Sequence, residues 1–162
     1  MDELPYWRVV MERRKSEPRW AEFAATNAKL IQEVQAELRH RGPLRSRDLD
    51  GKAVTHYRGS KETSVALYYL WLTGELLTQR RDGKERVYDF LENVAPPHLH
   101  HIAGRDEAEE FLTLKSVRQW GFTTPRLYRN VRKSVTGNSL NANQAKAELK
   151  RRVESGELAE VF

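Results

Sequence analysis

The dipeptide Asp82-Gly83 constrains the fold of this chain more than any other local feature. It separates two runs of β-forming side chains, residues 76–78 and 87–90. A tight type I′ turn needs positive φ at both central residues, and Asp-Gly adopts that conformation at low cost. We therefore predict a β-hairpin over residues 76–90 whose turn is Asp82-Gly83.

Helical patterns precede this hairpin. Apolar residues recur at three- to four-residue spacing, which is the period of an amphipathic helix. Ser60 is the predicted N-cap of the last helix, Gly74 is the left-handed residue predicted to end it, and Pro18 is expected to terminate the first one. The predicted elements are a lead-in helix over 4–15, a helix over 26–41, a short turn over 47–49 and a helix over 61–73. Helix, short helix, helix and hairpin is the element order of a winged helix, whose third helix enters the DNA major groove.

The second half of the chain repeats part of this order. Thr73-Gly74-Glu75-Leu76 corresponds to Ser155-Gly156-Glu157-Leu158, and each follows a helical pattern. We predict helices over 106–120, 126–133 and 141–155, and then a strand from Leu158 to Phe162. Such a strand would have no return strand, so its edge offers a surface for a homodimer.

The expected fold class is mainly α with a small β component, built from tandem winged helices. The first is predicted to be complete and the second to stop before its wing. The expected divisions are a lead-in helix over 1–19, the first winged helix over 20–93, a linker over 94–105 and a partial second winged helix over 106–162.

Positive charge is concentrated in the first unit. The chain carries a net charge of +5, and residues 39–90 hold 11 basic against 7 acidic side chains. Basic side chains that neutralise phosphates release counterions, which makes such binding steeply salt-dependent. The predicted nucleic-acid contacts of this unit lie before the third helix, on its first turn and around the hairpin tip: Arg58, Lys61, Thr63, Ser64, Arg80, Arg81, Lys84 and Arg86. A basic hairpin that only keeps a sheet edge soluble is the alternative interpretation.

The second unit has a basic run of its own over residues 126–133, with no acidic residue inside it. Helical spacing places Arg126, Arg129 and Lys133 along one face. This face is a second candidate phosphate contact, and an ordinary solvated surface explains it equally well.

Several classes of site are not expected. The absence of cysteine excludes disulfides, thiolate zinc ligands and a catalytic thiol. His98, His100 and His101 lie in a proline-containing segment without i, i+4 pairing, so we predict no metal and no other cofactor. No nucleophile with an adjacent base and no glycine-rich phosphate loop occurs, so we predict no catalytic residue. No run approaches the ~18 apolar residues of a membrane helix, and we expect a cytoplasmic protein without a membrane partner.

Three stretches of the sequence resemble one known family. They are RGPLRSRDL at 41–49, ALYYLWLTGEL at 66–76 and ERVYDF at 85–90. The chain is similar there to the AlkZ/YcaQ-type winged-helix proteins, which are bacterial DNA glycosylases that remove alkylated bases and unhook interstrand crosslinks. The resemblance implies tandem winged helices that shape a DNA channel, followed by a β-barrel. No Gln lies two residues from another Gln or from Asp, so the family's Gln-x-Gln or Gln-x-Asp motif is missing here.

The sequence therefore predicts a double-stranded DNA-binding module that corresponds to the middle part of such a repair protein, without the catalytic segment and the C-terminal barrel. Two other classes stay open. A winged-helix transcriptional regulator or a protein-interaction module would have no repair role, whereas an enzyme would release the damaged base unaided.

Overall fold

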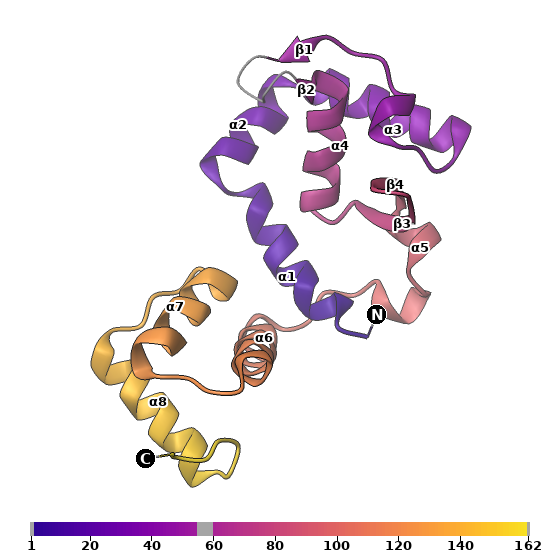
Figure 1. Ribbon diagram of the computed structural model, residues 1–162. Coiled ribbons are helices and arrows are strands. Elements are labelled where there is room, and N and C mark those ends of the chain that lie inside the picture. Colours follow the sequence, from indigo (N-terminus) through magenta and orange to yellow (C-terminus); the bar gives the residue numbers. More distant parts are fainter. Residues whose placement is uncertain (1, 55–59, 162) are drawn as a thin grey trace. The chain divides into compact units, whose positions relative to one another are not determined.

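The computed structural model describes residues 2–54 and 60–161. The chain divides into two compact units, residues 1–102 and 103–162. Helices dominate both, and the strands form two small antiparallel pairs, which confirms the predicted mainly α class with a small β component (Figure 1). No helix in the described part of the chain is long and apolar enough to cross a membrane.

Unit 1 holds the predicted helices together with helical elements that the sequence pattern did not predict, α2 being the longest of them. Its helical elements are α1 (Leu4–Lys15), α2 (Pro18–Thr26), α3 (Ala28–Arg41), the 3-10 helix η1 (Ser46–Asp48), α4 (Glu62–Leu72), α5 (Leu91–Val94) and η3 (Pro97–Leu99). Helix α2 was not predicted, because Pro18 was interpreted only as the end of α1. Proline also suits the first turn of a helix, where its missing N–H costs nothing, and Pro18 begins α2.

The start of α4 differs from the prediction, whereas its end agrees. The N-cap is Lys61 rather than Ser60, and its side chain makes no capping bond. Both residues form the short strand β2 (Ser60–Lys61). That strand pairs with β1 (Ala53–Val54). At the other end Gly74 has a φ of +79°, and the Glu75 N–H donates to the Leu70 carbonyl at 3.0 Å. The left-handed glycine thus ends α4 as predicted.

The hairpin consists of β3 (Leu76–Asp82) and β4 (Glu85–Phe90). Its turn is one residue further along than predicted. Asp82 pairs with Glu85, so the two-residue loop is Gly83-Lys84, and Gly83 takes a φ of +60°. The Leu44 backbone also pairs with Tyr88, on the free side of β4. Two bonds at 2.8 and 3.1 Å thereby tie the segment before η1 to the hairpin.

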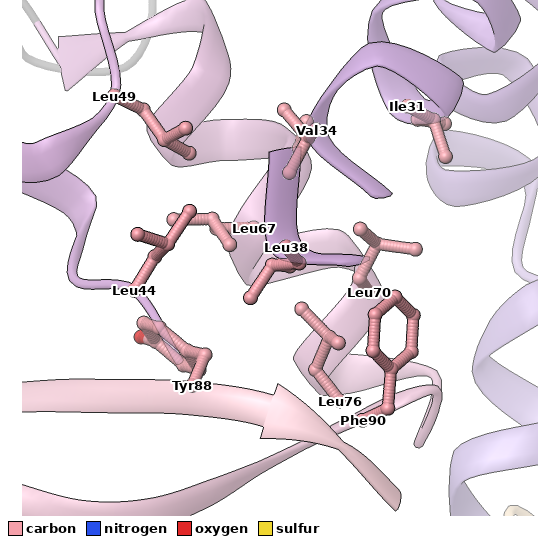
Figure 2. Packing of buried hydrophobic residues seen from close by; sticks show 11 residues of the cluster. Ile31, Val34, Leu38, Leu44, Leu49, Leu67, Leu70, Leu76, Tyr88 and Phe90 are labelled. Carbon is pink, nitrogen blue, oxygen red and sulfur yellow. The ribbon is translucent and has the colours of Figure 1, made fainter. Parts of the chain in front are cut away.

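The core of unit 1 lies between α3, α4 and the hairpin. Figure 2 shows side chains from the three elements converging around Leu38, which is 1% exposed. The buried members are Ile31, Val34, Leu38, Leu44, Leu49, Ala66, Leu67, Leu70, Leu76, Tyr88 and Phe90. Helix α4 lies between α2 and α3 (Figure 1), so each of its sides meets a different helix. Burial of each large apolar side chain contributes about 1.5–3 kcal/mol, which is enough to hold the hairpin against the helices.

Unit 2 consists of α6 (Arg105–Trp120), α7 (Pro125–Thr136) and α8 (Ala142–Glu154). The Thr124 hydroxyl accepts a hydrogen bond from the Leu127 N–H, so α7 begins at Pro125 as expected for a proline at the first helical position. Asn141 and Gln144 form a reciprocal capping box at the start of α8. Helix α7 extends to Thr136, beyond the predicted end at residue 133.

The strand predicted from Leu158 to Phe162 is wrong for the described residues 158–161, which form no strand. The turn before them does repeat that of unit 1. The Glu157 N–H donates to the Arg152 carbonyl at 2.9 Å, as Glu75 does to Leu70. A strand needs a partner for its backbone groups, and here Leu158 packs against the helices instead. The homodimer hypothesis depended on this strand, and the structure gives it no support.

A polar network holds the three helices of unit 2 together. Arg152 is fully buried, and its guanidinium contacts Glu110 at 3.0 and 3.1 Å, Glu157 at 2.9 Å and the Tyr128 hydroxyl at 3.1 Å. Tyr128 in turn donates to Glu148 at 2.8 Å. The sequence alone gives no sign of this network, because its members come from three helices that lie far apart along the chain.

Candidate functional site

The hairpin tip of unit 1 presents basic side chains on both faces of the sheet. A register shift at Gln79 separates the pair Thr78–Tyr88 from the pair Arg80–Val87. Because of this bulge Arg81, rather than Arg80, lies opposite Arg86 and on the same face. Like charges directly opposite each other are destabilising, so this pair of arginines favours an anion between or beside them.

The acidic side chains at the tip are already paired. Asp82 contacts Arg45 at 2.5 Å, and Glu85 contacts Arg47 at 3.1 Å. Arg45 also donates to Asp48 through Nε and Nη2 at 3.0 Å each. These hydrogen bonds lower the pKa of Asp48 to about 2. Arginines from η1 and its N-cap therefore neutralise the carboxylates of the hairpin tip.

The remaining cations of the tip have few partners. Among the described residues the structure gives neither Arg81 nor Lys84 an ion pair or a side-chain hydrogen bond, and both are exposed. Arg80 is exposed as well, and its one side-chain partner within residues 2–54 and 60–161 is the neighbouring Gln79. The hairpin tip therefore carries unneutralised positive charge, as a phosphate-binding surface requires.

The first turn of α4 is more engaged within the protein than the sequence suggests. Lys61 Nζ donates to the Leu49 carbonyl at 2.8 Å, and the Ser64 hydroxyl bonds with that of Ser46 at 2.5 Å. Thr63 is only 8% exposed. Arg58 lies outside the described residues. These contacts fix η1 against α4, and they leave the hairpin as the better exposed part of the candidate site.

Arg86 packs differently from the other basic residues of the hairpin. Its guanidinium carbon lies 4.4 Å from the centre of the Trp71 ring, a cation–π contact that joins β4 to α4. Tyr68, one helical turn before Trp71, is 40% exposed. The sequence placed Arg86 at the hairpin tip but gave no sign of its aromatic partner, because the two residues belong to different elements.

The basic side chains of α7 in unit 2 are of two kinds, some exposed and others bonded within the protein. Arg126 and Lys133 are exposed, whereas Arg129 Nε donates to the Leu140 carbonyl at 2.9 Å. Arg132, from the same run, forms an ion pair with Glu148 at 2.9 Å. Arg126 and Lys133 are thus the better exposed members of this surface.

The histidine segment forms local bonds only. His100 Nε2 lies 2.7 Å from the Ala95 carbonyl, and His101 Nδ1 lies 2.9 Å from that of His98. In the described ranges no three His, Cys, Asp or Glu side chains come together in a way that suits a metal ion.

Comparison with known families decides the broader class. The family model described as DNA glycosylase AlkZ-like matches residues 1–162. The chain belongs to this family. None of the curated proteins matches it, and none of the solved structures does. Membership of the AlkZ-like family supports a role related to glycosylase DNA repair and agrees with the resemblance found in the sequence.

Proposed function

We propose that this AlkZ-like chain binds double-stranded DNA as part of base-excision chemistry on alkylated or crosslinked bases. The observation that carries the proposal is the hairpin tip, where Arg81 faces Arg86 while Asp82 and Glu85 are neutralised from η1. Charge left over after internal pairing is available to phosphates.

Unit 1 is proposed to be a winged helix over residues 20–93, with α3, η1 and α4 as its three helices and the hairpin as its wing. The Leu44–Tyr88 bridge supports this assignment, because it adds a short third strand segment beside β4. We propose that Arg80, Arg81 and Lys84 contact the phosphate backbone. Residues 106–162 are proposed as a partial second winged helix. Arg126 and Lys133 are proposed as its weaker contacts, together with Arg129, whose Nε is already bonded to the Leu140 carbonyl.

Fluorescence anisotropy with duplex DNA over a salt series tests the proposal. Each lost phosphate contact reduces the slope of log K against log salt by roughly one. We expect the triple variant Arg80→Ala, Arg81→Ala, Lys84→Ala to bind more weakly and with a clearly shallower slope. Lys29→Ala removes one exposed charge from α3 and is the control, which should leave binding unchanged. Undetectable duplex binding at low salt, or a triple variant that binds like the parent, contradicts the proposal.

Binding and catalysis are separable in one further assay. On alkylated or crosslinked duplex we expect no base release above background by this chain alone, because no Gln-x-Gln or Gln-x-Asp motif occurs in it. Base release above background would assign the chain an activity of its own and would place the reacting residues elsewhere in it.

A further inference from the structure

Five side chains of unit 1 form a continuous row of rings flanked by guanidinium groups. The row begins on α2, crosses α4 and ends on β4. Successive centres lie 5.1, 5.7, 5.7 and 4.4 Å apart. Its ring pairs are tilted, with interplanar angles of 53° for Trp20 and Tyr68 and 35° for Tyr68 and Trp71. We call it the stacked row, and its members in spatial order are Arg19, Trp20, Tyr68, Trp71 and Arg86.

The stacked row has an anchored part and an open part. Trp20 is 6% exposed and also contacts Phe23 and Tyr69, so it belongs to the packing of α2 on α4. Tyr68 is 40% exposed, although large aromatic side chains contribute most when buried. The open part is therefore centred on the Tyr68 ring, with the half-buried Trp71, which also packs against the core, and the half-buried Arg86 beside it.

The charge at the open part is suited to an anionic partner. Arg86 lies on β4 directly opposite Arg81, whose guanidinium has no ion pair among the described residues. The nearest carboxylates of the hairpin, Asp82 and Glu85, are held by Arg45 and Arg47. A ligand that fits this place needs flat rings for the row and negative charge for the two arginines.

We propose that the open part of the stacked row binds unpaired bases of single-stranded DNA. A base that stacks on Arg86 extends the row by one member, a base on the exposed Tyr68 ring lies against its middle, and Arg81 neutralises the adjoining phosphate. Proteins that bind single strands combine positive charge along the backbone with stacking of bases on aromatic rings and guanidinium planes. Bases inside a duplex are already covered on both faces, so duplex DNA cannot use the row in this way. This inference rests on the proposed function, which makes DNA the ligand.

The experiment compares a fluorescein-labelled oligothymidine of 15 nucleotides with a duplex of the same length, by anisotropy at low salt. Arg86→Lys keeps the charge and removes the planar group. Arg39→Lys is the matched control, because Arg39 also lies over a ring, 5.0 Å from Phe90, but outside the row. We expect Arg86→Lys to weaken oligothymidine binding roughly 5-fold or more, while Arg39→Lys leaves it unchanged.

The exposed ring supplies a second, independent arm. Tyr68→Leu should weaken oligothymidine binding by a similar factor and duplex binding by less than about 2-fold, and Tyr68→Phe should restore it because the ring is kept. Trp7→Leu removes another exposed ring, 38% accessible on α1, and should have no effect. Circular dichroism of each variant checks folding.

The two proposals fail in different ways. If the parent binds duplex but not oligothymidine, or if Arg86→Lys matches Arg39→Lys in effect, the stacked row is only a packing device and this inference is overturned. If the triple hairpin variant leaves duplex binding intact, the proposed function fails even where oligothymidine binding depends on Tyr68 and Arg86.

Discussion

Arg152 and Glu110 form a bidentate ion pair in which the cation is fully buried and the carboxylate is 44% exposed. Burial alone would lower the pKa of Arg152, but hydrogen bonds to Glu110 and Tyr128 outweigh it and raise this pKa above its usual value. The same hydrogen bond holds the pKa of Glu110 below its usual range. The turn that follows matches the one after Leu70, so a charged residue occupies in unit 2 the place that an apolar one has in unit 1.

This asymmetry leads to the first prediction. Glu110→Ala leaves a buried guanidinium with Glu157 as its remaining carboxylate, and we expect it to destabilise unit 2 by roughly 3 kcal/mol. Arg152→Met removes the buried charge and fills similar space, and the carboxylates that it frees can reach water. The loss in stability of unit 2 should therefore be smaller for Arg152→Met than for Glu110→Ala. Hydrogen exchange of peptides from α6 to α8 measures both. A larger loss for Arg152→Met than for Glu110→Ala would contradict this account.

The core of unit 1 depends on Leu38. Its side chain is 1% exposed, at the point where α3 meets α4 and the hairpin (Figure 2). Leu38→Ala removes packing and leaves a cavity, so we expect a loss of about 2–5 kcal/mol in the free energy of unfolding of unit 1. His40→Ala on the exposed side of the same helix should change it by less than about 0.5 kcal/mol. Hydrogen exchange of the α3 and α4 amides separates the two variants.

Two glycines with positive φ differ in what surrounds them. A Cβ at Gly74 would lie 2.8 Å from Met11 Sδ and 3.2 Å from Met11 Cβ, whereas one at Gly83 would meet no atom within 4 Å. Both substitutions by alanine carry the backbone penalty of about 1 kcal/mol. Gly74→Ala must also displace the Met11 side chain of α1, so it should lower the thermal midpoint of unit 1 further than Gly83→Ala. Equal thermal midpoints for the two variants would show that the Met11 side chain moves aside without loss of stability.

Acid should weaken the contact between η1 and its N-cap. The pKa of Asp48 is about 2 in the folded protein, against an ordinary 3.8, because Arg45 donates hydrogen bonds to the carboxylate. Since the folded pKa is the lower one, the stabilisation is complete above about pH 4 and is lost as the pH falls through about 2. Asp48→Asn should flatten this part of the stability profile, measured by denaturant unfolding at several pH values. An unchanged profile would mean that other carboxylates account for the acid dependence.

Local patterns in the sequence were sufficient for several elements. Helix α1 has the predicted bounds, α4 ends at the predicted glycine, and the hairpin lies where two β-forming runs flank a glycine turn. These features depend on capping, turn conformation and the period of nearby apolar residues, all of which are readable within a few residues. The local pattern did not predict the one-residue shift of the turn to Gly83-Lys84, because pairing across the two strands sets the register.

The sequence by itself determined the class of the fold, the basic hairpin and the resemblance to the family. The tertiary structure decided which charges are available. It pairs Asp82 and Glu85 with arginines from η1 and its N-cap. Lys61 and Ser64 form hydrogen bonds within the protein, and Arg152 is buried. Arg81 and Lys84 stay exposed. It also aligns rings from α2 and α4 with Arg86. The physical reason is that neutralisation and stacking act between side chains distant in sequence, so only packing reveals which charge remains for a ligand.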